Sequence, residues 1–499
     1  MNKKIVLKNI ISSLIFQLIA LIYGFVVPKL IIEQYGSEVS GLTSSIVQFL
    51  SYIMLLEAGI GPVIKNELFK PIVENDNQKI QDILGASNRF FRRIAYIFLL
   101  YICVLCIFYP RIVCDRFDFL YTLSLIIIIS ISTFFEYFLG MTYKLFLQAD
   151  QKNYLIDYVS IFTYIITLIT IIVLIKFNLN IQIVKFATAV LTVIRPVFLK
   201  IYFNKVYNLR ANRKSKYVLQ KKWDGLSHHI ASVVQSNTDT IVLTLYDNLI
   251  NVSIYSVYYL VINGVRAIIV SLTNGIDAFF GKLMVEGNRK DISNRFNTYS
   301  TIFFTLTTVI LSCTIVLIVP FVKVYTSNIT DANYILPCFA YILVFAEFLY
   351  VIRYPFSTIV YAKGHFRQTR IFSLIEPIVN IILSILFVKK FGLIGVAFGT
   401  ALSMPIRSFG FIIYASTRIL EIPLKSVFKK VFVSFFELLL VLSIYLLIGN
   451  YDVNSYFQWI QLALLCGTLI LTAIILINFA IFKNDFNQIL NLINNRRGK

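Results

Sequence analysis

Residues 119–141 read FLYTLSLIIIISISTFFEYFLGM and contain a single charged side chain, Glu136. A helix rises about 1.5 Å per residue, so a segment of this length crosses a hydrocarbon layer of roughly 30 Å. Strands of membrane barrels are shorter, about ten residues, and alternate in polarity, which this segment does not do. The stretch therefore predicts a membrane-spanning α-helix.

Similar apolar segments recur from one end of the chain to the other. We predict about fourteen transmembrane helices, with twelve or thirteen as the alternative if one pair is wrongly divided. The predicted spans are 9–31, 40–64, 94–114, 119–141, 154–176, 181–203, 228–247, 251–281, 299–322, 333–360, 371–388, 391–415, 431–449 and 457–482.

Composition supports the membrane class. Of the 499 residues, 58% are hydrophobic and 14% are charged, whereas soluble proteins carry about 25% charged residues. The net charge of +21 would suggest nucleic acid in a soluble protein, but here the basic residues lie in short loops between apolar runs. We therefore expect lipid around the protein and no nucleic-acid partner.

Lysine and arginine also predict the orientation. If the amino terminus is cytoplasmic, the cytoplasmic segments hold 33 of the 46 basic residues, the outer segments hold eight, and five lie within spans. Positive charge concentrates in cytoplasmic loops. Both termini are therefore predicted to be cytoplasmic.

The predicted fold is an all-α integral membrane protein with two six-helix lobes, helices 1–6 and 7–12, around a central cavity. The expected parts are a lobe over 1–203, a basic cytoplasmic linker over 204–227, a lobe over 228–417 and two appended helices over 431–482. A faint internal repeat supports two lobes, because Leu147–Lys152 resembles Val360–His365 at an offset of 213 residues. The long segment 65–93 reads as an amphipathic connector.

No catalytic motif is present in the sequence. It lacks a GxxxxGK[ST] phosphate loop, an HExxH pair and a GxSxG elbow. Cys103 and Cys106 form a CxxC spacing without a second pair nearby, so buried apolar cysteine is the better interpretation than a metal site. We predict no enzyme, no catalytic residue, no metal and no cofactor, with Na⁺, a proton or the membrane potential as candidate driving forces.

Charged and amide side chains within the spans are the candidate site. A charge at the bilayer centre costs at least about 2.5–3.5 kcal/mol, so such residues usually face a cavity or a partner. The predicted substrate-binding residues are Arg266, Arg353, Asn237, Gln235 and Asn263. The predicted cation-coupling residues are Asp239, Glu57 and Glu347.

Two further expectations concern these charges. Arg266 is expected to pair with Asp239, because a short loop joins their helices. Arg195, Arg407 and Glu437 lie nearer helix ends, where long side chains can reach the membrane surface. The competing interpretation of the polar residues is that they hydrogen-bond one helix to another. We favour it for Ser, Thr and single Asn or Gln residues, and a cavity lining for Asp239, Arg266 and Arg353.

Several motifs resemble bacterial polysaccharide repeat-unit flippases of the Wzx type, which export O-antigen and capsule units. These flippases belong to the multidrug/oligosaccharidyl-lipid/polysaccharide exporter superfamily. The motifs are Gly24–Lys29, Tyr35–Gly41, Leu56–Pro62, Ala86–Arg92, Lys222–Ile230, Asn237–Asp239, Val252–Tyr259 and Ser271–Ile276.

The resemblance implies a location, a cargo and partners. It implies a multi-pass protein of the bacterial cytoplasmic (inner) membrane that works by alternating access, with helices 1, 2, 7 and 8 lining the cavity. The implied cargo is an oligosaccharide on undecaprenyl diphosphate, carried to the outer leaflet for surface polysaccharide biosynthesis. A polysaccharide polymerase and chain-length proteins are the implied protein partners.

Three other functions compete with this one. A cation-coupled multidrug antiporter would have an acidic cavity, and the mid-span arginines argue against it. A peptidoglycan lipid-precursor flippase is a near neighbour that the residues do not separate from the first hypothesis. A membrane glycosyltransferase or polymerase would need an acidic catalytic motif or large outer loops, and the outer loops predicted here have about ten residues.

Overall fold

The computed structural model describes residues 3–57, 59–209, 211–212, 217, 219, 226–273, 275–286, 289–449 and 452–488. Residues 210, 213–216, 218 and 220–225 of the predicted basic linker lie outside this part of the chain, as do residues 58 and 274 of the motifs quoted above. The chain forms two compact units, unit 1 (Met1–Val233) and unit 2 (Val234–Lys499).

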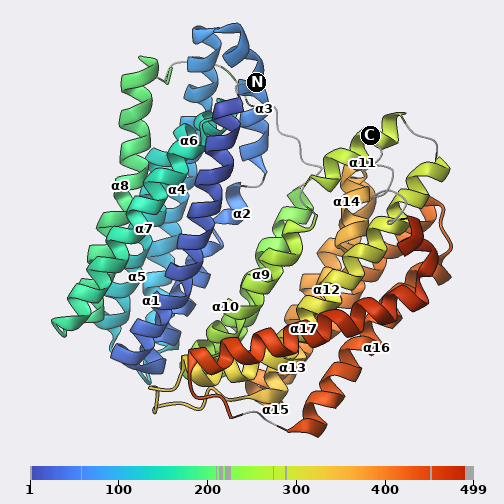
Figure 1. The fold of residues 1–499 in the computed structure, drawn as a ribbon. Helices are drawn as coiled ribbons and strands as arrows, with labels where there is room; N and C mark the ends of the chain where they lie inside the picture. The colour runs from blue at the N-terminus through green and yellow to red at the C-terminus, as the bar shows by residue number, and fades with distance from the viewer. Residues whose placement is uncertain are drawn as a thin grey trace. The chain divides into compact units, whose positions relative to one another are not determined.

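Unit 1 consists of helices joined by short turns (blue to green in Figure 1). They are α1 (Lys3–Ser51), α2 (Met54–Glu57), α3 (Ile60–Glu74), α4 (Asn77–Ile112), α5 (Phe119–Phe135), the π-helix η1 (Glu136–Gly140), α6 (Met141–Ala149), α7 (Asn153–Lys176) and α8 (Ile181–Tyr207). The 49-residue helix α1 is two helices joined at Gly36, whose φ of 84° interrupts the helical backbone. Glycine takes a positive φ without steric cost, so the chain bends there.

Unit 2 is also helical (green to red in Figure 1). Its elements are α9 (Leu226–Tyr246), which contains the boundary between the units, α10 (Leu249–Ser271), α11 (Ile276–Glu286), α12 (Arg289–Tyr325), α13 (Pro337–Val351), α14 (Tyr354–Ala362), α15 (Phe366–Tyr414), the π-helix η2 (Ala415–Leu420), α16 (Leu424–Ile448) and α17 (Tyr456–Ile481). Helix α15 bends at Gly392, where φ is 53°.

The helices confirm the predicted fold class. No strand occurs among the described residues, and eleven of their helical runs are long and apolar enough to cross a membrane. The runs Lys4–Glu57 and Phe366–Leu420 are long enough to cross twice, with their bends at Gly36 and Gly392. The eleven runs, two of them counted twice, give thirteen crossings among the described residues. Helix α9, which is more polar and is not one of the eleven, is long enough to be the fourteenth of the predicted helices.

The outward faces of these helices are apolar. Leu100, Leu120, Leu386 and Leu464 are each more than half exposed. Soluble proteins rarely expose apolar patches of this extent. Such faces suit a protein surrounded by lipid, so the chain is a multi-pass membrane protein.

The faint sequence repeat has a structural counterpart. Gln151 and Gly364 both adopt positive φ, at 58° and 73°. In each turn the following residue closes back on the preceding helix: Lys152 N donates to Leu147 O at 2.8 Å, and His365 N donates to Val360 O at 3.0 Å. Both ends of each hydrogen bond keep the offset of 213 residues, so equivalent turns occur in the two units.

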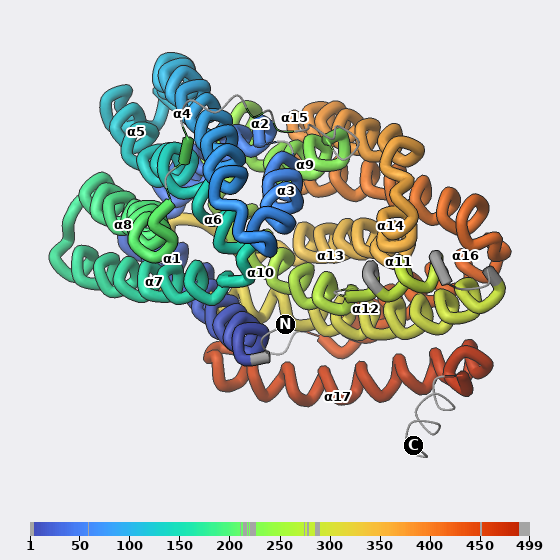
Figure 2. The backbone as a smooth tube through the Cα atoms, turned by 90° about the horizontal axis from the view of Figure 1, so that it is seen from above, coloured from blue at the N-terminus to red at the C-terminus, as the bar shows by residue number. Residues whose placement is uncertain are grey.

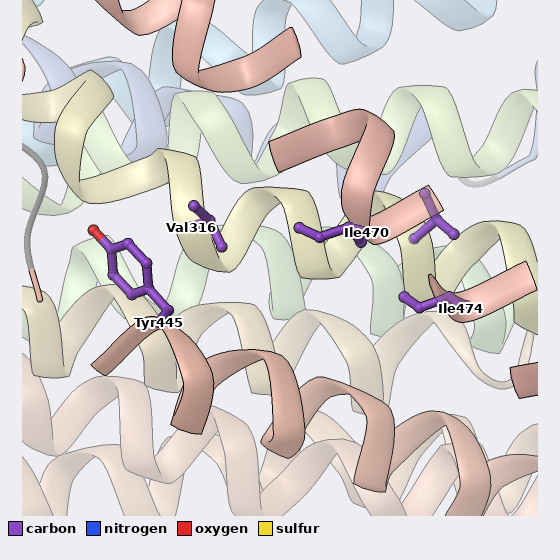
Figure 3. Close-up of a cluster of buried hydrophobic side chains, with 5 residues drawn as sticks. Val316, Tyr445, Ile470 and Ile474 are labelled. Atoms are coloured by element: carbon purple, nitrogen blue, oxygen red, sulfur yellow. The ribbon is translucent and has the colours of Figure 1, made fainter. Parts of the chain in front are cut away.

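The last two helices pack against α12 within unit 2, and α17 runs alongside α12 in Figure 2. Figure 3 shows Val316 of α12 beside Tyr445 of α16, with Ile470 and Ile474 of α17 in the same buried cluster. Lys430 Nζ fastens the start of α16 by donating to Asn297 O at 2.8 Å. Apolar packing and hydrogen bonds at the helix ends thus join the appended helices to unit 2.

Two predicted boundaries are wrong. The span 251–281 is interrupted, because α10 ends at Ser271 and α11 begins at Ile276, after Gly275 with a φ of 81°. The connector 65–93 is not one segment, because α3 ends at Glu74 and α4 begins at Asn77. Asp76 caps α4 by accepting a hydrogen bond from Lys79 N at 3.0 Å, as aspartate commonly does at helix starts.

Candidate functional site

A small polar pocket lies inside unit 2, between α9, α10, α13 and α15. Gln235 and Asp239 are one turn apart on α9, so both face it. Arg266 enters from α10 and Glu347 from α13. The cavity measures about 30 Å³, which is space for one or two water molecules. Its own side chains therefore fill most of the pocket.

A tight turn brings α9 and α10 together. Asn248 stands before α10 and accepts a hydrogen bond from Asn251 N at 2.8 Å, which caps the helix. Asp247, in the same turn, accepts from the Asn251 side chain at 2.8 Å. The two helices can then run back along each other, which places Asp239 and Arg266 on the same pocket.

Arg266 and Glu347 form a two-point ion pair in the pocket. Arg266 Nε donates to Glu347 Oε1 at 2.9 Å, and Nη2 donates to Oε2 at 2.5 Å. The Glu347 side chain is 1% exposed and that of Arg266 is 18% exposed. These bonds use Nε and Nη2, and no hydrogen bond from Nη1 occurs within the described residues. The guanidinium therefore keeps donors for another anionic group.

A second charged cluster adjoins the first. Arg353 Nη1 donates to Glu376 Oε1 at 3.1 Å, and Arg407 Nη1 donates to Oε2 of the same carboxylate at 3.4 Å. All three side chains are buried. Two arginines share one carboxylate, so this cluster carries an excess positive charge.

Tyr350 connects the two clusters. Its ring centroid lies 4.2 Å from the guanidinium carbon of Arg266 and 3.8 Å from that of Arg353. Cation–π attraction stabilises both guanidiniums and is strongest where water is excluded. The ring therefore lies between two positive charges that would otherwise repel each other across the pocket wall.

Asp239 occupies a different polar environment. Its Oδ2 accepts from Tyr255 Oη at 2.9 Å and from Thr400 Oγ1 at 2.8 Å. Asn380 in turn donates to Thr400 Oγ1 at 2.8 Å, while its own Oδ1 is buried without a hydrogen-bond partner among the described residues. Carboxylate and hydroxyl oxygens thus lie side by side at Asp239 and Thr400, and oxygen ligands suit hard cations.

The structure brings four of the predicted site residues together: Arg266, Gln235, Asp239 and Glu347 line one pocket. Arg353 is adjacent, beyond Tyr350. Asn237 is buried on α9 and Asn263 is exposed on α10, and neither lines that pocket.

The expected Arg266–Asp239 ion pair is wrong. Glu347, on α13, is the partner of Arg266, while hydroxyl groups hold Asp239. The short loop between α9 and α10 did not predict the pairing, because in a helical bundle the nearest opposite charge can lie on a helix that is distant in sequence. The expectation that Arg407 and Glu437 reach the surface is also wrong. Both are buried, and Glu437 accepts a hydrogen bond from Asn478 at 2.6 Å.

Sequence reasoning missed Tyr350, Tyr255, Thr400 and Asn380 as site residues. One signal was available for Tyr350, because it follows Glu347 by three residues, a spacing that places both on one helix face. Tyr255, Thr400 and Asn380 had no comparable signal, since single hydroxyls and amides in apolar helices mostly serve packing.

Glu57 belongs to unit 1. It accepts a hydrogen bond from Tyr137 Oη at 3.3 Å and lines a cavity of about 470 Å³ inside that unit. Glu136 and Arg195 line the same cavity, with Arg195 Nη2 3.0 Å from Glu136 Oε2. The protein therefore has a separate polar cavity in each unit.

No protein-family profile and no curated protein matches this chain. Solved structures do. The lipid II flippase MurJ, in an inward closed conformation, is similar with a TM-score of 0.60 and 19% identity, over 96% of this chain and 99% of that one. An inward-facing multidrug resistance MATE family transporter of the MOP superfamily gives a TM-score of 0.57 and 13% identity, over 83% and 95% of the two chains.

The eukaryotic MATE transporter AtDTX14 gives a TM-score of 0.54 and 14% identity, over 86% of this chain and 99% of that one. At these identities the likeness concerns the fold. The chain is a multi-pass membrane protein with the fold of MOP-superfamily transporters.

Proposed function

We propose that the protein is a flippase for undecaprenyl-diphosphate-linked oligosaccharide repeat units in surface polysaccharide biosynthesis. It moves them from the cytoplasmic to the outer leaflet of the bacterial cytoplasmic membrane by alternating access, with both termini cytoplasmic. It transports rather than catalyses, and a polymerase and chain-length proteins receive its cargo. The observation that carries this proposal is the Arg266 guanidinium, which lies within a membrane span and whose Nη1 makes no hydrogen bond in the part of the chain that the structure describes.

Arginine suits a diphosphate. Its planar fork donates parallel hydrogen bonds to two oxygens, and it stays protonated at any physiological pH. Arg353 and Arg407, with one carboxylate between them, add positive charge beside the pocket. The headgroup of the lipid exchanges places with Glu347 at Arg266 when the pocket opens, so the guanidinium is paired with an anion before and after the exchange.

Asp239 is the coupling group in this proposal, with Glu347 as the carboxylate released when the headgroup binds. The oxygens of Asp239 and Thr400 take a sodium ion or, at the carboxylate alone, a proton. Glu57 in unit 1 is the third coupling candidate. Asn237 and Asn263 contact the substrate only in a conformation in which their helices have moved.

Two alternatives rest on the comparisons. Fold similarity to the lipid II flippase MurJ supports a peptidoglycan lipid-precursor flippase, and similarity to MATE transporters supports a cation-coupled multidrug antiporter. The excess of arginine in unit 2 favours an anionic cargo over a cationic drug. Rescue of cells depleted of their lipid II flippase would support the first alternative, and increased drug resistance on expression would support the second.

A charge exchange tests the proposal. Arg266→Ala leaves Glu347 buried without a counter-charge, so lost function in that variant alone could reflect misfolding. The double variant Arg266→Glu/Glu347→Arg keeps an ion pair but moves the arginine from α10 to α13. We expect both variants to lose surface polysaccharide in a deletion strain, while the double variant retains wild-type abundance in the membrane. Normal polymer from Arg266→Ala would remove Arg266 from the mechanism.

A further inference from the structure

The larger polar cavity of the protein lies inside unit 1. It measures about 470 Å³ and is lined by residues from α1, α2, α5, η1, α6, α7 and α8. Its size falls in the range of small-molecule sites. The residues predicted for headgroup binding lie in unit 2, and of the residues that line this cavity only Glu57 has been given a role so far, as a coupling candidate.

The charges in this cavity balance. Two carboxylates, Glu57 and Glu136, face two cations, Lys144 and Arg195. Arg195 Nη2 lies 3.0 Å from one oxygen of Glu136, and Lys144 Nζ lies 3.6 Å from the other. A charged ligand would upset this balance inside a membrane span, where uncompensated charge is costly. The cavity therefore favours an uncharged, polar ligand.

The hydroxyl groups in the wall present acceptors. Ser160, Thr163 and Thr192 donate to Ile156 O, Val159 O and Ala189 O of their own helices, each at 2.8 Å. A hydroxyl has one proton and two lone pairs, so these oxygens keep acceptor capacity toward the cavity.

The carboxylates add further acceptors. Glu57 accepts from Tyr137 at 3.3 Å, and Glu136 Oε1 accepts no hydrogen bond within the described residues. A wall rich in acceptors needs a ligand rich in donors. Phosphate offers almost none at neutral pH, whereas a sugar offers a hydroxyl on most carbons.

Aromatic side chains also line the unit 1 cavity. Tyr137 and Tyr164 both line the cavity, and Tyr164 is packed against Tyr23 at a ring distance of 4.7 Å, which fixes its orientation. The apolar faces of sugar rings pack on aromatic side chains, while charged and hydroxyl groups bind the ring edges. Carboxylates, cations, hydroxyls and tyrosines all line this one cavity.

We propose that the unit 1 cavity binds a neutral sugar residue of the transported lipid, separately from the arginines of unit 2. The cargo class rests on the proposed function, and the sugar site adds to it. Sugar selection is then a property of unit 1, since its wall matches hydroxyl donors, and diphosphate binding is a property of unit 2. The cavity wall discriminates against acidic sugars, because a carboxylate on the ligand would add an uncompensated charge to the balanced set of Glu57, Glu136, Lys144 and Arg195.

A bulk substitution tests the site in transport. In proteoliposomes containing the full-length protein, two fluorescent cargos are compared: polyprenyl diphosphate carrying one N-acetylhexosamine, and the same lipid diphosphate without sugar. Ser132→Phe places a ring in the cavity. Ile127→Phe introduces the same ring on the same helix at an exposed position and is the control.

We expect Ser132→Phe to lower the ratio of the two transport rates, glycosylated lipid to bare lipid, by about tenfold. A tenfold change corresponds to the loss of one or two hydrogen bonds to the sugar. Ile127→Phe is expected to keep the wild-type ratio. An unchanged ratio in Ser132→Phe would overturn the sugar site.

A binding measurement separates this proposal from the flippase proposal. In a variant without the six native cysteines, Thr133→Cys lines the cavity and is labelled by a maleimide. We expect neutral disaccharides (maltose, lactose and N,N′-diacetylchitobiose) to slow the labelling, and glucuronate and inorganic diphosphate to leave it unchanged.

Protection by diphosphate, or by no disaccharide, overturns the sugar site whatever the transport assay shows. If wild-type protein moves neither lipid but the disaccharides protect Thr133→Cys, the flippase proposal fails and the sugar site stands.

Discussion

The guanidinium carbon of Arg353 lies 3.8 Å from the centroid of the Tyr350 ring, and the same ring lies 4.2 Å from the guanidinium carbon of Arg266. One aromatic side chain thus contacts the arginine of each ion cluster in unit 2. Its removal changes both clusters at once, which makes Tyr350 the natural position at which to test whether they act together.

We predict that Tyr350→Leu lowers both stability and transport, and that Tyr350→Phe does not. Phenylalanine keeps the ring face that attracts the guanidiniums, whereas leucine loses it, at a cost of about 2 kcal/mol or more for desolvated pairs. Thermal unfolding of the purified variants in detergent measures the first effect, and lipid movement in proteoliposomes measures the second. Equal melting temperatures for the two variants would show that the ring face contributes nothing.

The buried carboxylate of Glu376 is predicted to be essential for folding. It accepts hydrogen bonds from Arg353 and Arg407, so Glu376→Gln leaves two buried arginines without their counter-charge. Removing one partner of a buried ion pair costs about 3–5 kcal/mol. We expect little Glu376→Gln protein in the membrane by immunoblot, and partial recovery in Glu376→Gln/Arg407→Gln.

Glu74→Gln is the control for this prediction. Glu74 pairs with Lys70 at 3.7 Å on an exposed helix face, and exposed pairs contribute about 0–1 kcal/mol. Its abundance should match wild type. Wild-type abundance of Glu376→Gln itself would contradict the role given to this carboxylate.

Asp239→Asn is predicted to uncouple transport from its driving ion. Asparagine keeps an oxygen that accepts from Thr400 and Tyr255, so the packing of the variant should be conserved, but it carries no charge to bind a cation. Lipid movement is measured in proteoliposomes with and without an inward gradient of Na⁺ or of protons. Wild type should respond to one gradient and Asp239→Asn to neither, with Thr400→Ser, which retains the hydroxyl, as the control. A full gradient response in Asp239→Asn would assign coupling elsewhere.

Cys114 provides a test of orientation. It is exposed in the loop between α4 and α5, on the side predicted to be outside. With the other five cysteines replaced, a membrane-impermeant maleimide should label Cys114 in intact spheroplasts. A cysteine placed at Gln151, in the turn between α6 and α7, should be labelled only after permeabilisation. The reverse pattern would invert the predicted topology.

The number and placement of spans could be predicted from the sequence because the hydrophobic signal is summed over some twenty residues. One polar residue in a segment such as 154–176 does not change its prediction as a membrane helix, and α7 indeed covers Asn153–Lys176. Breaks that depend on one backbone conformation were less visible. The backbone breaks between α10 and α11, where Gly275 has a positive φ, yet the predicted apolar span continues through this glycine to residue 281.

The site was predictable only in part, for a similar reason. Arg266 and Glu347 stand out because an ionised group in an apolar span is costly wherever it lies. Arg266 and Glu347 lie 81 residues apart in the chain, so their pairing depends on how α10 packs against α13. A single sequence does not show which helices pack together. Of the unit 1 cavity only Glu57 was predicted as a site residue, because Ser, Thr and Tyr, which supply the uncharged polar part of its wall, are common in membrane helices for packing reasons alone.

Gly392→Ala is predicted to destabilise unit 2. The bend in α15 needs φ of 53° and ψ of −131° at this residue, a combination that side chains disfavour. A Cβ atom there would also lie 3.3 Å from Asp247 Oδ2, close enough to displace the turn between α9 and α10. Backbone strain of this kind costs about 1–3 kcal/mol. We expect a lower melting temperature in detergent, together with slower lipid movement, because Asp247 belongs to the turn that holds α9 and α10 at the pocket.

The matched control for this glycine is Gly467→Ala. Gly467 lies within helix α17, and a Cβ atom there would meet nothing within 4 Å. Alanine is a better helix former than glycine by about 1 kcal/mol, so this variant should be as stable as wild type or more so. Equal melting temperatures for Gly392→Ala and Gly467→Ala would show that the bend in α15 forms without a residue of positive φ. Packing against neighbouring helices, and not the backbone conformation at Gly392, would then bend α15 into its two membrane crossings.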